Sequence, residues 1–149
     1  MSDPTSPILP DEEITRFARM NASAFPYVVT ALARECGRSA DDAAAFVGRT
    51  FAPGWEEVRG QGARVAARYM ALNLASGGAD VVALTGDEGH AEVRAAGYGD
   101  EGELAFYGLT RDDLDRFVGT FGPIAEHLGL RADWRREGEE IVVTVERPG

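Results

Sequence analysis

The stretch that decides the fold is LTRDDLDRFVGTFGPIAEHLGL, residues 109–130. Its apolar residues recur every three or four positions, as on one face of a helix: Leu114, Phe117, Val118, Phe121, Ile124, Ala125 and Leu128. Thr110 can accept from the first free backbone N–H groups, and Gly129 is typical of a helix end. The pattern predicts one helix over 110–128, bent at Gly122-Pro123 because proline removes a backbone hydrogen bond.

Segments with strand character flank this helix on both sides. We predict one hairpin from strands at 80–85 and 90–96, and a second from strands at 131–136 and 140–147. In the second hairpin, alternation places these residues on the covered face: Ala132, Trp134, Ile141, Val143 and Val145. The chain order around the helix is therefore β-β-α-β-β.

The first half of the chain has helical patterns. We expect helices over 12–20, from Pro26 to a stop at Gly37, from the cap Ser39 to about 52, and over 55–75. Gly60 and Gly62 fall inside the last helix and indicate close approach of another helix, with phosphate binding as the alternative. Residues 1–10 are expected to form a flexible tail. Residues 11–149 are expected to form a single α+β domain, in which N-terminal helices pack on a four-stranded antiparallel sheet.

The charge distribution excludes several classes of partner. The net charge is −10, and the half of the chain from residue 76 carries 16 acids against 7 arginines. No basic patch is visible, so we expect neither nucleic acid nor a membrane as a partner. The chain has no lysine, which excludes Schiff-base chemistry and a lysine-bearing phosphate loop. Such a composition is typical of a GC-rich, bacterial-like genome.

Cys36 is the only cysteine, so the chain can form neither an internal disulfide nor a cysteine-based zinc cluster. It falls on an apolar helix face, where a free cysteine is usually buried. No signal-peptide pattern or membrane-length apolar run is present. We therefore expect a cytoplasmic protein.

Two histidine–carboxylate pairs are candidates for metal binding or acid–base chemistry. Asp87, Glu88 and His90 share a predicted hairpin turn, although a turn favours such residues for backbone reasons alone. Glu126 and His127 end the central helix, where His127 suits the helix dipole. The acidic run at 100–103 lacks the spacing of a calcium loop. The sequence thus assigns no catalytic residue and no metal ligand, and it leaves the cofactor unknown.

A set of aromatic residues gives the strongest indication of a binding site. The set is Trp55, Tyr69, Tyr98, Phe106 and Tyr107, with Trp134, and it could line a pocket between the long helix and the sheet or form plain core. Four glycines between 97 and 108 predict a mobile lip, which could include a short strand at 104–107. Acids at 100, 101 and 103 would favour a small neutral or cationic apolar ligand.

The layout of helices followed by β-β-α-β-β resembles the haem-nitric-oxide-binding domains and the related vinyl-4-reductase-like domains, over roughly residues 39–147. The clearest local likeness is a helix ending in HLGL at 127–130, then Trp134, then IVVTV at 141–145. The resemblance implies a ligand-binding or sensing domain that often dimerises through its helices. The long helix lacks the family's haem-ligand histidine, and its propionate motif and cysteine cluster are also missing. No site residue is carried over.

Two functional hypotheses follow. The first is a non-enzymatic sensing or regulatory module that binds a small apolar ligand or a protein partner, with a homodimer as the expected assembly. It requires a cavity of roughly 300 Å³ or more, or an exposed apolar groove. The alternative is a small hydrolase or lyase that uses His90 or His127 with a neighbouring carboxylate. It requires an imidazole that reaches both a concave pocket and a carboxylate.

Overall fold

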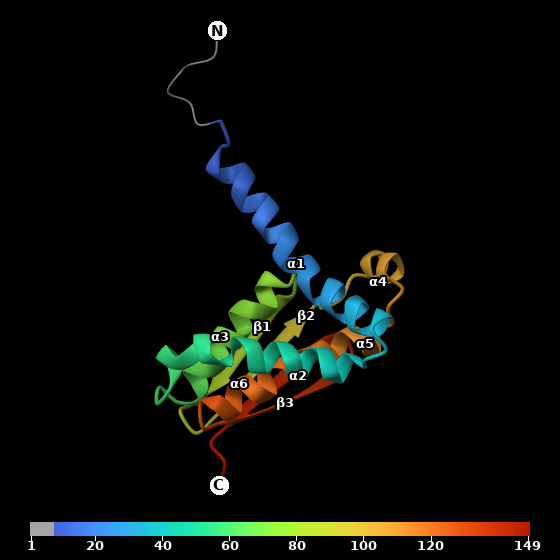
Figure 1. Ribbon diagram of the computed structural model, residues 1–149. Coiled ribbons are helices and arrows are strands. Elements are labelled where there is room, and N and C mark those ends of the chain that lie inside the picture. The colour runs from blue at the N-terminus through green and yellow to red at the C-terminus, as the bar shows by residue number, and fades with distance from the viewer. Residues whose placement is uncertain (1–7) are drawn as a thin grey trace.

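The computed structural model describes residues 8–149 and has the predicted α+β architecture (Figure 1). Its helices are α1 (Asp11–Glu35), α2 (Ala40–Phe51), α3 (Ala63–Ser76), α4 (Glu101–Tyr107), α5 (Arg111–Arg116) and α6 (Phe121–His127). Two 3-10 segments, η1 (Ala52–Val58) and η2 (Phe117–Thr120), join some of them. Its strands are β1 (Asp80–Gly86), β2 (His90–Ala96), β3 (Arg131–Glu137) and β4 (Glu140–Glu146).

The four strands form one antiparallel sheet in the spatial order β1-β2-β4-β3. Both predicted hairpins are confirmed, and β4 lies between β2 and β3 because it pairs with each of them along its whole length. The expected alternation places Ile141, Val143 and Val145 in the core, where each is at most 1 % exposed. A strand with this many β-branched residues suits the centre of a sheet.

The opposite face of the sheet carries charged side chains in place of helices. Val142 lies on that face, in register with Arg94 and Arg135, and is nevertheless fully buried. Arg94 pairs with Glu92 and Glu137, and Arg135 also pairs with Glu137. The stems of the two arginines can cover Val142 while their charged ends stay in water.

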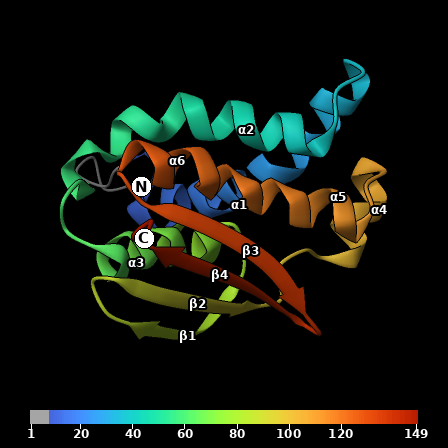
Figure 2. The ribbon, with the colours of Figure 1, turned by 90° about the horizontal axis from the view of Figure 1, so that it is seen from below.

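The helices form two layers over the other face of the sheet. The segment α5–η2–α6 and helix α3 contact the strands, and α2 lies beyond α6 (Figure 2). The C-terminal half of α1 crosses this outer layer, where Tyr27 Oη accepts from the N–H of Asp100 at 2.8 Å. Arg34 donates to the carbonyl oxygen of Gly108 at 3.0 Å and pairs with Asp113.

The predicted central helix is present as the near-continuous segment α5–η2–α6. Thr110 forms the expected cap, since its side chain accepts from the N–H of Asp113 while Asp113 accepts from Thr110. The departure from regular α-helix comes at η2, one turn before Pro123, because a proline cannot donate to the carbonyl four residues earlier and its ring crowds that group. The expected bend therefore appears as a short 3-10 stretch.

The sequence interpretation of the first half was wrong in two places. Residues 12–36 do not form two helices, because α1 continues through Pro26 as one 25-residue helix. The expected helix over 55–75 begins only at Ala63. Gly60 and Gly62 have φ of 80° and 91°, and such positive φ values end a helix. A Cβ on Gly62 would lie 3.0 Å from Glu88, so the close neighbour is the β1–β2 turn and not a helix.

The segment after β2 also differs from the prediction. Residues 104–107 belong to α4 and not to a strand. Asp100 caps this helix by accepting from the N–H of Glu103, and Gly108 ends it with φ of 67°. Gly97 and Gly99 therefore precede a short helix, Gly102 lies inside it and Gly108 ends it.

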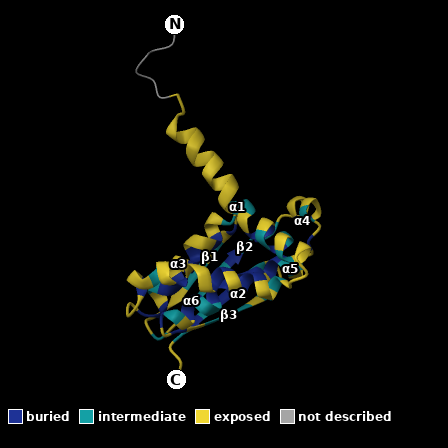
Figure 3. Cartoon of the chain, in the orientation of Figure 1, coloured by how far each residue is buried: buried dark blue, intermediate teal, exposed yellow. Residues whose placement is uncertain are grey.

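Burial falls off sharply along α1 (Figure 3). Of the predicted tail, residues 1–7 lie outside the described residues, and Ile8 and Leu9 are 98 % and 62 % exposed. Residues 11–22 are exposed as well, and the buried positions begin at Pro26. Within residues 8–149, no helix combines the length and the hydropathy that crossing a membrane requires.

Candidate functional site

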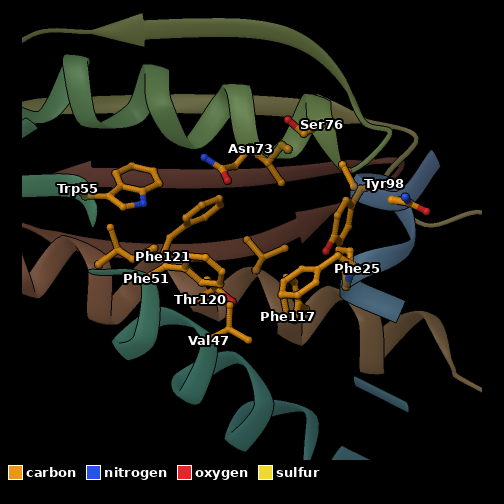
Figure 4. Close-up of a pocket in the computed structure, with 17 residues that line it drawn as sticks. Phe25, Val47, Phe51, Trp55, Asn73, Ser76, Tyr98, Phe117, Thr120 and Phe121 are labelled. Atoms are coloured by element: carbon orange, nitrogen blue, oxygen red, sulfur yellow. The ribbon is translucent and has the colours of Figure 1, made fainter. Parts of the chain in front are cut away.

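A pocket of about 560 Å³ lies between the inner and outer helical layers (Figure 4). Its walls come from α1, α2, η1, α3, Tyr98 after β2, and the segment η2–α6. Six aromatic residues line it: Phe25, Phe51, Trp55, Tyr98, Phe117 and Phe121. The volume lies in the range of pockets that hold small organic ligands.

The aromatic rings meet edge to face around the pocket. The ring centroid of Phe25 lies 6.2 Å from that of Phe51 and 6.1 Å from that of Phe117, with interplanar angles of 86° and 79°. Trp55 approaches Phe121 in the same way at 6.5 Å. Such contacts fix the directions of the rings without filling the space between the helices.

Gly48 sets the distance between α2 and the inner layer. A Cβ built on Gly48 would lie 2.4 Å from the carbonyl oxygen of Thr120 and 3.0 Å from the ring of Pro123. Any side chain there would push α2 away from η2. This contact brings Val47 and Phe51 of α2 onto the pocket wall.

Among residues 8–149, no charged residue lines the pocket, and its polar residues are Asn21, Asn73, Ser76, Tyr98 and Thr120. Of its polar residues, Asn73 donates to the carbonyl oxygen of Tyr69 and Ser76 donates to that of Leu72, so both are engaged within α3. Thr120 differs, because its Oγ1 is buried and forms no hydrogen bond with any residue in the range 8–149. A buried hydroxyl without a partner is unfavourable.

Tyr98 is another lining residue that carries a hydroxyl group. Its backbone carbonyl accepts from Arg111 at 3.0 Å and from Arg136 at 3.4 Å. Arg136 in turn donates two hydrogen bonds, of 2.6 and 2.7 Å, to the carboxylate of the buried Asp115. Burial, and secondly the negative charge of Asp115, raise the pKa of the Tyr98 hydroxyl well above its ordinary value. The phenol is therefore protonated and able to donate.

The structure brings only some of the predicted aromatic residues together. Trp55 and Tyr98 line the pocket, and Tyr69 lies beside Trp55 with ring centroids 6.0 Å apart. Tyr107 lies on α4, where it stacks on Tyr27 at 5.5 Å, and Phe106 is 80 % exposed. Neither of these two α4 residues lines the pocket. Trp134 belongs to strand β3 and packs against the core.

The acids expected at a lip are engaged elsewhere. Asp100 caps α4, and Glu101 pairs with Arg111. None of the acids at 100, 101 and 103 lines the pocket, so they are not in contact with a ligand that binds there. From the segment 97–108, Tyr98 alone lines the pocket.

The histidine–carboxylate pairs lie outside this pocket. Asp87 accepts from the N–H groups of Gly89 and His90 at 2.9 and 3.1 Å, which lowers its pKa and stabilises the turn, while His90 is exposed. His127 Nε2 lies 2.7 Å from Glu56 Oε2. Arg59 also pairs with Glu56, and this contact together with that of His127 lowers the pKa of the Glu56 carboxyl.

Cys36 is exposed at the end of α1, so the expectation of a buried thiol was wrong. Within residues 8–149, no group of three or more His, Cys, Asp or Glu side chains is arranged to hold a metal ion. No known protein-family model matches the chain, and no curated protein matches it. Function is therefore inferred from the residues of the pocket.

Proposed function

We propose that the protein is a non-enzymatic sensing or regulatory module that binds a small, neutral, largely apolar ligand in the aromatic pocket. The observation that carries the proposal is a cavity of about 560 Å³ between the helical layers, which six aromatic residues line and which no charged residue in the range 8–149 lines. Thr120, whose buried Oγ1 has no partner among these residues, is one of its few polar lining residues. Ligand sites commonly have this composition, with a few polar groups that orient an apolar molecule. The ligand is expected to carry a hydrogen-bond acceptor, such as a carbonyl oxygen, for Thr120 or Tyr98.

The pocket supports a neutral ligand better than a charged one. Burying a charge without an opposite charge nearby is costly, and the lining offers neither a carboxylate nor a guanidinium. The expectation that a cation would also bind depended on acids that lie outside the pocket. Selectivity for neutral molecules is therefore part of the proposal.

The test is a titration with the neutral naphthyl ketone prodan, whose emission shifts in apolar surroundings. We expect saturable binding, and no comparable binding of a naphthalenesulfonate of similar size. Thr120→Val should weaken prodan binding about 3- to 10-fold, the value of one hydrogen bond. The same substitution should leave the unliganded protein as stable or slightly more stable, because it removes a buried hydroxyl without a partner.

A second pair of variants tests the location. Ala22 lies exposed on α1 at the pocket, so Ala22→Trp should block it. Ala75 lies exposed on α3 and does not line the pocket, so Ala75→Trp is the matched control. Equal prodan binding by both variants would place the ligand elsewhere and contradict the proposal.

Acid–base catalysis by His127 is the second candidate, because its imidazole lies 2.7 Å from a carboxylate oxygen of Glu56. The pair is favoured less, since both side chains are partly exposed and neither lines the aromatic pocket. Hydrolysis of neutral aryl esters that Glu56→Gln abolishes would support it. For the ligand-binding module we also propose a cytoplasmic setting. The resemblance to haem-nitric-oxide-binding domains supports this module only through the layout of its elements.

A further inference from the structure

The first three turns of α1 project from the body of the molecule as a helical arm, residues 11–21 (Figure 1). Isolated helices of this length are marginal in water, because tertiary packing supplies most of the stability of a helix. Within residues 8–149, nothing covers the outer side of this arm (Figure 3). The arm is therefore a surface that lacks its packing partner.

The two sides of the arm differ in chemistry. Glu12, Arg16 and Arg19 line the hollow that separates the arm from α3, together with the apolar Met20, so the charged residues of the arm lie on the side that faces the protein's own body. Ile14 and Phe17 lie on the other side and are 51 % and 49 % exposed. An arm that folded back on its own chain would place its apolar side inward, so this orientation indicates an intermolecular contact.

Beyond the polar Asn21, the apolar side of the arm continues along the rest of α1. Ile14, Phe17, Phe25, Val28 and Leu32 follow one another at helical spacing, and each is 40–61 % exposed. The buried residues Pro26, Tyr27 and Thr30 lie on the opposite side of the same helix. We call these five exposed residues the α1 stripe.

An empty apolar groove lies beside the second half of the stripe. It has a volume of about 470 Å³ between α1 and α2, and Phe46 and Phe51 form its α2 side with exposures of 63 % and 52 %. One molecule thus presents an apolar helix without a groove and an apolar groove without a helix. The same two features on a second molecule would complement both.

We propose that the occupant is a second copy of this chain, which pairs antiparallel along α1 about a two-fold axis. In this arrangement Ile14 of one copy packs against Leu32 of the other, and Phe17 packs against Val28. Each arm then lies in the groove of the other copy, and the contact closes after two molecules. Phe25 and Phe51 also line the ligand pocket, but the proposal does not require a bound ligand.

The area of the contact supports this occupant. Seven half-exposed apolar side chains per copy would bury roughly 500 Å² each side, or about 1,000 Å² in total. That area is where specific interfaces begin. An anionic membrane is a poorer occupant, because the arm begins with three acids.

The first test is sedimentation equilibrium of the full chain and two variants over the micromolar range. We expect a dimer for the wild type, and self-association weakened by about 100-fold or more in Phe17→Glu. Thr15→Glu adds the same charge on the other side of the arm and should remain dimeric. A monomeric wild type, assembly beyond a dimer, or equal loss in both variants would overturn the proposal. Matching circular dichroism spectra of Phe17→Glu and Thr15→Glu would exclude unfolding as the cause of the weaker association.

The second test reads the orientation. Single cysteines replace Ile14 or Leu32 in a Cys36→Ser background, and the two proteins are oxidised separately and as a mixture. Antiparallel pairing predicts that the mixture forms the crosslink between Ile14→Cys and Leu32→Cys, because disulfides need close Cα atoms. Crosslinks formed mainly within each separate protein would indicate parallel pairing and overturn the arrangement. Binding of the monomeric chain to anionic vesicles would identify a membrane as the occupant instead.

Discussion

The inner and the outer helical layers of this protein differ in how completely their apolar residues are packed. Against the sheet, Ile124, Ile141 and Val143 are at most 2 % exposed. In the outer layer, Phe46 and Leu32 are more than 60 % exposed, and a pocket remains between the layers. The difference indicates that the inner layer stabilises the fold and that the outer layer provides surfaces for other molecules.

The sharpest contrast should come from truncating one apolar side chain in each layer. Ile141→Ala removes a fully buried side chain and is expected to lower the free energy of unfolding by about 2–5 kcal/mol. Phe46→Ala removes a larger but mainly exposed side chain and should change the free energy of unfolding of the monomer, measured at a protein concentration too low for self-association, by less than about 0.5 kcal/mol. Urea unfolding measures both. Similar losses in the two variants would contradict the division into two layers.

The contact between the layers can be broken at one glycine. Gly48→Ala places a Cβ 2.4 Å from a backbone oxygen, and relief of this overlap is expected to cost about 1–3 kcal/mol. Gly122 is the matched control, because it lies in α6 with open space around it. Gly122→Ala should be neutral or stabilise by up to about 1 kcal/mol. If Gly48→Ala were equally harmless, α2 would not be held at the distance that shapes the pocket.

The smallest expected effect concerns the β1–β2 turn. Backbone N–H groups of Gly89 and His90 hold the pKa of Asp87 below its usual value. A lowered folded-state pKa contributes stability above the ordinary carboxyl pKa of about 3.9, and the contribution is lost as the pH falls through the lower folded value. The stability difference between the wild type and Asp87→Ala should therefore be constant near neutral pH and shrink below about pH 4.

The control for this prediction is Asp87→Asn, which keeps an acceptor oxygen but cannot titrate. The difference in unfolding free energy between Asp87→Asn and Asp87→Ala should stay the same as the pH falls, because neither variant can be protonated at residue 87. Chemical unfolding of the three proteins between neutral and acid pH measures the difference. A gap between wild type and Asp87→Ala that widened on acidification would contradict the role assigned to the carboxylate.

The sheet and the central helical segment could be predicted because their signals are local. Alternation in β4 and the cap at Thr110 depend on residues within a few positions of each other. The first half was predicted less well, since Pro26 stands inside a helix that neighbouring residues sustain, and positive φ at Gly60 and Gly62 is not visible in a helical pattern. Helix α4 depends on a cap at Asp100 and a glycine stop at Gly108 that a search for strands overlooks.

The pocket could be anticipated only in part. Trp55 and Tyr98 were predicted as lining residues because aromatic side chains next to glycines suggest a cavity. Phe25, Phe51, Phe117, Phe121 and Thr120 were not proposed, although they also line it. They come from four separate elements, and which helices face one another depends on long-range contacts such as that of Gly48 with Thr120. No local pattern reports such a contact.

The most direct measurement of the central claim uses the two tryptophan indole N–H signals in a proton–nitrogen correlation spectrum. Trp55 lines the pocket, whereas Trp134 belongs to strand β3 and packs against the core. Titration with prodan should shift the Trp55 signal saturably and leave the Trp134 signal in place. If the Trp55 signal stayed fixed while prodan bound, or if both signals moved together, the pocket between the helical layers would not be the binding site.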